Sequence, residues 1–343
     1  MENLMPQSDR TAPRGSKRNS RNLLFVIGAV IGVAVLTLAV ARVGAAKATG
    51  NSVVPAPSAN LGTNPTANWP DIKLMSATQV LNRAADLSVS AADQPIRPGQ
   101  FRYVNKHAWV MNTMQFGDKI GYSYLWEQQD QRWIPADEHN VWQETRKVLN
   151  TGKFLGGSVP QAQATQLPPT DVDQGQWQGR CGDFFPEAKP PKKCDDSTDW
   201  DSSAFYAALP RDPSALYAKL QSLTKGNSAA PSAMFNVGIQ VLEAGMMPAE
   251  LRAQWYRALA KIPGMAVLAA ETNLDGRTGV ALGLDDGHQI RQLIIDPVTG
   301  QFIGERQIAG PQPEQSWIKP NTEIGSSAFT TAVVDQLGAA PAK

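Results

Sequence analysis

The chain contains two cysteines, Cys181 and Cys194, and three kinds of chemistry use such a pair: metal binding, redox exchange and disulfide formation. A metal site needs more ligands at close spacing, and no CxxC or HxxxH accompanies the pair. A redox pair usually has two intervening residues, whereas twelve lie between these cysteines. We therefore expect a disulfide, which requires an oxidising compartment outside the cytoplasm.

Motifs for catalysis are missing from the sequence. No GxSxG or HExxH is present, and no GxGxxG or GxxxxGK[ST] follows a predicted strand. The three histidines, His107, His139 and His288, are far apart in the sequence and are expected to be ordinary strand or surface residues. We therefore expect no enzyme activity, no cofactor and no bound metal.

An acidic run follows the second cysteine, and its carboxylates could bind calcium outside the cell. It lacks the glycine and the distal glutamate of an EF-hand loop. The alternative is that these carboxylates precede a helix near Ser202 and favour its positive end, which we prefer. The residues are Asp195, Asp196, Asp199 and Asp201.

Aromatic residues are concentrated between positions 109 and 142, in a segment that alternates as strands do. A curved sheet could turn them inward to line an apolar cavity, as in lipid-carrying half-barrels. They could also pack under helices as core, which strand propensity favours, or form a partner surface. The residues proposed to line a cavity are Trp109, Tyr122, Tyr124, Trp126 and Trp133, and Trp142 completes the cluster.

Residues 23–41 form an apolar run of 19 residues without a charge. As a helix this run spans about 28 Å, close to the thickness of a hydrocarbon core. Five basic residues precede it and two follow closely, so the N-terminus is expected in the cytoplasm. We expect a single-pass plasma-membrane protein whose segment 1–22 is cytoplasmic and whose main domain is extracytoplasmic.

The alternative is a cleaved signal peptide with Ala39-Val40-Ala41 as its cleavage site. The apolar run exceeds the roughly 7–15 residues of a usual signal peptide, so we prefer an uncleaved anchor. Gly28 and Gly32 form a GxxxG pattern that could pair two such helices, but small residues are common throughout the segment. We therefore prefer chance as the explanation of the pattern, with a transmembrane homodimer as the alternative.

The charge of the chain is unevenly distributed. Residues 1–47 contain seven basic and two acidic side chains, which leaves 25 basic and 29 acidic side chains for the rest. A mildly acidic main body argues against sequence-independent binding of nucleic acid, which needs clustered Lys and Arg.

Turn and capping signals divide the remainder into elements. Residues 42–71 predict a flexible tether, and 72–337 an extracytoplasmic domain that begins with a helix capped by Ser76. About four antiparallel strands are expected within 100–150, with turns at 116–119, 128–131 and 136–140. A polar surface insertion that holds both cysteines follows at about 156–202. Three helices come next, the first capped by Asp212 and the second ending at Gly245, and two hairpins follow that turn at NLDGR and DPVTG. The predicted fold class is α+β: a curved antiparallel sheet with helices packed on one face, preceded by one transmembrane helix.

Three segments carry a resemblance to a known family: LPRDPSALYAKL, MPAELRAQWYRALAKIPG and IIDPVTGQFIGERQ. They resemble a family of uncharacterised, single-pass membrane-anchored actinobacterial proteins, some of which look like companions of extracytoplasmic-function sigma factors. The resemblance implies the anchor and the fold. The 22 residues before the anchor are too short for a helical sigma-binding domain, so direct inhibition of a sigma factor is not expected.

The function predicted from these observations is non-catalytic binding, sensing or scaffolding in the cell envelope, with another envelope protein as partner. The alternative is carriage of an apolar ligand, such as a lipid, in a half-barrel cavity.

Overall fold

The computed structural model describes residues 74–116, 120–164, 174–185, 192–224 and 230–341. The predicted cytoplasmic segment, the transmembrane helix at 23–41 with its GxxxG pattern, and the tether at 42–71 lie outside the described residues. Of the helices that are described, none has the length and apolar character needed to cross a membrane.

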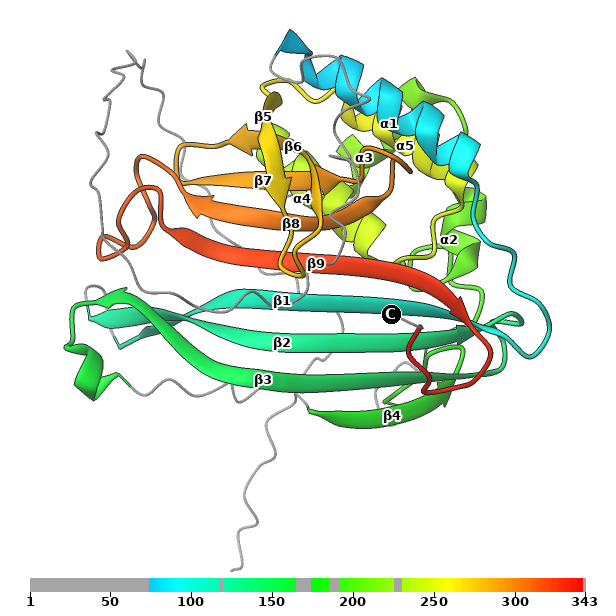
Figure 1. Ribbon diagram of the computed structural model, residues 1–343, viewed down its shortest axis with the longest axis horizontal. Coiled ribbons are helices and arrows are strands. Elements are labelled where there is room, and N and C mark those ends of the chain that lie inside the picture. The colour runs from blue at the N-terminus through cyan, green and yellow to red at the C-terminus, as the bar shows by residue number, and fades with distance from the viewer. Residues whose placement is uncertain (1–73, 117–119, 165–173, 186–191, 225–229, 342–343) are drawn as a thin grey trace, which may run out of the picture.

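The described strands form one open, curved antiparallel sheet in the order β4-β3-β2-β1-β9-β8-β7-β6-β5 (Figure 1). The chain builds one half outward from β1 to β4, crosses to the far edge through the helices, and returns from β5 to β9 beside β1. The strands are β1 (Phe101–Gln115), β2 (Gly121–Pro135), β3 (Val141–Gly157), β4 (Gly175–Arg180), β5 (Ala266–Thr272), β6 (Thr278–Asp285), β7 (Gln289–Ile295), β8 (Phe302–Ala309) and β9 (Glu323–Val334).

The meander at the start of the sheet has three long strands where the sequence predicts about four. The segment 128–131 reads as a turn in the sequence, but β2 runs through it and pairs with β1 without interruption. Two of its polar side chains bond across the sheet: Gln129 donates to Asn105 and Gln131 donates to Tyr103. Part of the predicted insertion also belongs to the sheet, because β4 pairs with β3.

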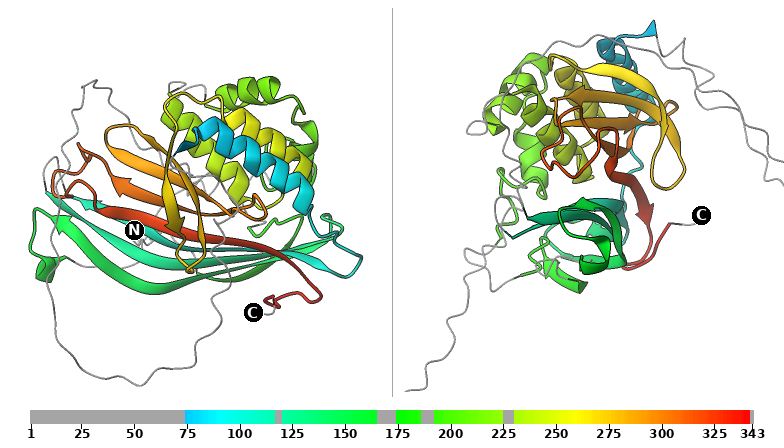
Figure 2. Two further views of the ribbon diagram at one scale, coloured as in Figure 1. Left: turned by 45° about the horizontal axis from the view of Figure 1, so that its top comes forward. Right: turned by 90° about the vertical axis from the view of Figure 1, so that its left-hand side faces the viewer.

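Five α-helices are described, and they pack on one face of the sheet, as the fold class predicts. Figure 2 shows that they gather over one part of the sheet and that β1–β3 extend beyond them. Ser76 caps the first helix through the predicted capping box, and Asp212 caps the third. The helices are α1 (Ala77–Ala91), α2 (Ser203–Ala208), α3 (Pro213–Leu223), α4 (Pro231–Glu243) and α5 (Ala249–Leu259).

α4 and α5 pack closely against each other, and a short connection joins them. Trp255 is fully buried, and its Nε1 donates to the carbonyl oxygen of Gly238 at 3.1 Å. A Cβ at Gly238 would lie 2.5 Å from a methyl group of Leu259, so a larger residue would force that side chain to shift. α4 then stops at Gly245, whose φ of +70° is the left-handed conformation typical of a helix end.

The predicted disulfide between Cys181 and Cys194 is present, with their Cα atoms 5.1 Å apart. It ties the residue that follows β4 to the segment that leads into α2, and Cys181 is buried.

Replacing both cysteines by serine is expected to lower the free energy of unfolding by about 2–3 kcal/mol, because the open chain gains conformational entropy when unfolded. Urea titration followed by tryptophan fluorescence measures the change. Reductant should destabilise the wild-type chain similarly and leave the double variant unaffected. Equal stability of the oxidised and reduced wild type would contradict a stabilising role.

Candidate functional site

Three of the predicted aromatic residues, Tyr122, Tyr124 and Trp126, do come together. They alternate along β2 on the face that carries the helices, and each is between 1% and 4% exposed. No described member of their cluster comes from α1–α5; the other members are Val110, Val148, Phe154, Val159 and Ala164. These three rings are therefore packed as a separate small core.

Trp109 and Trp133 lie on the opposite face of the sheet. Trp126 and Trp133 are an odd number of residues apart in an uninterrupted strand, so their side chains point to opposite faces. Trp133 packs against Tyr103, with ring centroids 5.4 Å apart, and its Nε1 donates to the carbonyl oxygen of Ala339. Trp109 is half-buried on that face. The five residues therefore do not surround one common space.

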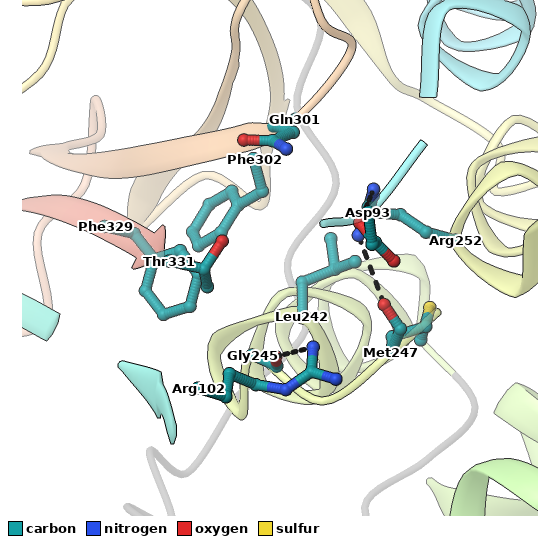
Figure 3. Close-up of a pocket in the computed structure, with 10 residues that line it drawn as sticks. All are labelled: Asp93, Arg102, Leu242, Gly245, Met247, Arg252, Gln301, Phe302, Phe329 and Thr331. Atoms are coloured by element: carbon teal, nitrogen blue, oxygen red, sulfur yellow. Dashed lines mark hydrogen bonds and ion pairs between the residues drawn. The ribbon is translucent and has the colours of Figure 1, made fainter. Parts of the chain in front are cut away.

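A pocket forms at another place, where the segment after α1, the α4–α5 connection, α5 and strands β1, β8 and β9 converge (Figure 3). We call it the junction pocket. Its volume of about 30 Å³ has room for roughly two water molecules. It is lined by Asp93, Arg102, Leu242, Gly245, Met247, Arg252, Gln301, Phe302, Phe329 and Thr331.

Asp93 uses both carboxylate oxygens to hold α5 in place. Oδ2 accepts a hydrogen bond of 2.6 Å from the backbone N–H of Ala249, the first residue of α5, where Pro248 provides no side-chain cap. Oδ1 accepts from Nη2 of Arg252 at 2.9 Å. Arg252 also donates through Nη1 to the carbonyl oxygen of Met247 at 3.1 Å. This side of the pocket is an ion pair that also caps a helix.

Arg102 is held differently. Its Nη1 donates to the carbonyl oxygen of Gly245 at 3.2 Å, at the end of α4. A Cβ at position 245 would lie 2.8 Å from Val104, so glycine is needed at this approach. Burial lowers the pKa of Arg102 below its usual value, and the more distant charges of Asp93 and Glu138 only partly offset this. No carboxylate oxygen of the described residues lies within 4.0 Å of the guanidinium of Arg102.

The junction pocket therefore carries a positive excess. Two guanidinium groups and one carboxylate line it, and Nε of both Arg102 and Arg252 is shielded from solvent without a hydrogen-bond partner. Figure 3 shows the two arginines on different sides of Leu242, with Phe302, Phe329 and Thr331 opposite Arg252. Sequence patterns could not reveal this site, because Asp93, Arg102 and Arg252 are joined only by the tertiary fold.

His107 contacts a carboxylate with each of its two ring nitrogens. Its Nδ1 lies 2.6 Å from Oδ1 of Asp275, and its Nε2 lies 2.9 Å from Oε1 of Glu127. Burial alone would lower the pKa of His107, but hydrogen bonds to these two carboxylates raise it overall. Both ring nitrogens of His107 are therefore engaged with carboxylates of the same chain.

The acidic run beside the disulfide is used in local contacts. Asp201 pairs with Arg132 at 2.5 Å, Asp199 with Lys192 at 3.3 Å, and Asp195 with the exposed His139 at 3.1 Å. Asp196 accepts hydrogen bonds from the backbone and hydroxyl of Thr198. In the described part of the chain, no group of three or more His, Cys, Asp or Glu side chains is arranged to hold a metal ion.

Comparison with known proteins produced no assignment. No protein-family model, no curated protein and no solved structure matched the chain significantly. The resemblance to membrane-anchored actinobacterial proteins therefore remains a prediction from the sequence.

Proposed function

We propose that this chain is a membrane-anchored, non-catalytic protein of the cell envelope whose extracytoplasmic domain binds another protein. The anchor and its orientation rest on the apolar run at 23–41 and the basic residues before it. The disulfide between Cys181 and Cys194 supports a domain that lies outside the cytoplasm.

The observation that carries the proposal is the apolar end of the β1–β2 hairpin, which we call the hairpin tip: Met114, Phe116 and Ile120. These side chains are 37%, 60% and 53% exposed. The backbone N–H of Phe116 donates to the carbonyl oxygen of Ile120 at 2.8 Å, which holds their backbones together. Methionine and aromatic residues are enriched at protein interfaces, so a grouped apolar tip favours a protein partner.

The packing of the aromatic residues gives less support to the alternative, an apolar-ligand carrier. Ligand pockets usually enclose about 300–1,000 Å³, whereas the two best-formed pockets of the described residues hold about 30 Å³ each. Tyr122, Tyr124 and Trp126 are packed against neighbouring side chains. Lipid carriage would require these side chains to move apart.

A photo-crosslinking amino acid in place of Phe116 tests the proposal in the full chain in its native membrane. Val298 is a matched control, because it is also 60% exposed and apolar. It lies in the turn before β8, and β8 runs parallel to β1 because both are antiparallel to β9. The control is therefore at the end of the sheet opposite to the hairpin tip.

The expected result is a protein adduct of discrete mass from position 116 and none from position 298. An adduct with lipid alone at position 116 would contradict a protein partner. Equal crosslinking from both positions would mean that the hairpin tip has no special affinity.

A further inference from the structure

We infer that the junction pocket binds an oxyanion, a carboxylate or phosphate group, on the guanidinium of Arg102. This inference goes beyond the proposed function, because it concerns the end of the sheet where β1 begins, opposite to the hairpin tip.

The first argument is the missing counter-charge of Arg102. Other basic side chains that project from the helix-covered face are paired: Arg132 with Glu144, Arg291 with Glu305 and Lys106 with Glu243. Among the described residues, Arg102 has no such ion-pair partner; it donates a hydrogen bond to the Gly245 carbonyl oxygen. A partly buried charge without an ion-pair partner is unfavourable, so an anion that pairs with Arg102 would be stabilised there.

The second argument is that the nearby carboxylate of Asp93 is engaged elsewhere and forms no ion pair with Arg102. Both oxygens of Asp93 are occupied, one by Ala249 N–H and the other by Arg252. Because Asp93 already caps α5 and pairs with Arg252, the guanidinium of Arg102 supplies the excess positive charge that favours an anion.

The third argument concerns the shape and chemistry of the walls. Phe302 and Phe329 pack together, with ring centroids 5.2 Å apart, and form an apolar wall beside the polar Thr331. A volume of about 30 Å³ admits only a small group. Guanidinium recognises carboxylate and phosphate oxygens, so the site suits either a small free oxyanion or the terminal group of an organic ligand whose carbon atoms meet the rings.

The test is calorimetric titration of the full chain in detergent micelles with inorganic phosphate and with acetate, at constant ionic strength held by chloride. Arg102→Gln removes the charge. Arg180→Gln is the matched control, because Arg180 is exposed and also donates to a backbone carbonyl oxygen, that of His139. Gln301→Glu is a second variant that adds a negative charge to the pocket and leaves the Arg102–Gly245 hydrogen bond intact.

We expect saturable binding of at least one anion to the wild type, weakened about tenfold or more by Arg102→Gln and by Gln301→Glu. Arg180→Gln should bind as the wild type does. Absence of saturable binding to the wild type would overturn the inference, and so would unchanged binding in Gln301→Glu or in a folded Arg102→Gln variant.

Monobutyl phosphate distinguishes the source of the oxyanion. Tighter binding than inorganic phosphate means that the group is carried on an organic ligand that contacts Phe302 and Phe329; equal affinity means a free ion. Both results require the junction pocket to bind the phosphate. Because crosslinking at the hairpin tip does not involve this pocket, failure of either proposal leaves the other standing.

Discussion

Replacement of Trp126 by alanine is expected to lower the free energy of unfolding by about 3–5 kcal/mol. The ring is 3% exposed and packs in the cluster with Tyr122 and Tyr124, so its removal leaves a cavity that the neighbouring strands can fill only in part. Urea titration of the variant and the wild type, followed by circular dichroism, measures the difference.

Trp109→Ala is the control for this prediction, because Trp109 is half-buried and lies on the other face of the same hairpin. It should destabilise the chain much less. If Trp126→Ala costs less than about 1 kcal/mol, the ring is not packed as core, and a cavity beneath β2 becomes the better account.

Removal of the Glu305 carboxylate is the second change with a large expected effect. Oε2 of Glu305 accepts from Nε of Arg291 at 2.8 Å and from its Nη2 at 2.6 Å, and both side chains are buried or nearly so. Glu305→Ala leaves the Arg291 charge uncompensated and is expected to cost about 3–5 kcal/mol. Thermal and urea unfolding at neutral pH measure this loss.

Two further variants show whether the loss of stability comes from the uncompensated charge of Arg291. Arg291→Met combined with Glu305→Leu should recover most of the stability, because buried ion pairs can often be replaced by apolar pairs. Asp86→Ala breaks an ion pair with Arg257 in which Asp86 is exposed, and should cost less than about 1 kcal/mol. A double variant no more stable than Glu305→Ala would contradict the explanation.

The same pair predicts a pH dependence. Burial alone would raise the pKa of Glu305, but the charges of Arg291 and Lys106 outweigh it and hold that pKa below its usual range. A lowered folded pKa means that the contribution is complete above the unfolded value of about 4.3 and is lost as the pH falls through the folded pKa. The stability difference between wild type and Glu305→Ala should therefore shrink in acid.

Local signals in the sequence predicted the parts of the fold that depend on neighbouring residues. The Ser76 capping box, the Asp212 cap and the helix end at Gly245 are each present. The two predicted hairpins also form, one turning at residues 273–277 and the other at 296–300. Each of these features needs only a few consecutive side chains and a backbone conformation that they favour.

Features that depend on distant residues could not be predicted in this way. The polar stretch at 128–131 looks like a turn, and only its pairing with β1 makes it the middle of a strand. Trp126 and Trp133, both proposed to line one cavity, therefore lie on one continuous strand and point to opposite faces. The junction pocket was even harder to predict from the sequence, because its charged side chains come from three separate segments. These are the segment after α1, the start of β1, and α5.

Native mass spectrometry of the full chain, extracted with its partner in mild detergent, tests the central claim most directly. The account predicts the disulfide-bonded chain in complex with a protein, without a retained lipid. It also predicts that Phe116→Ser abolishes the complex and Val298→Ser preserves it. A stoichiometric lipid that is lost only on denaturation, or a complex indifferent to Phe116→Ser, would contradict the account.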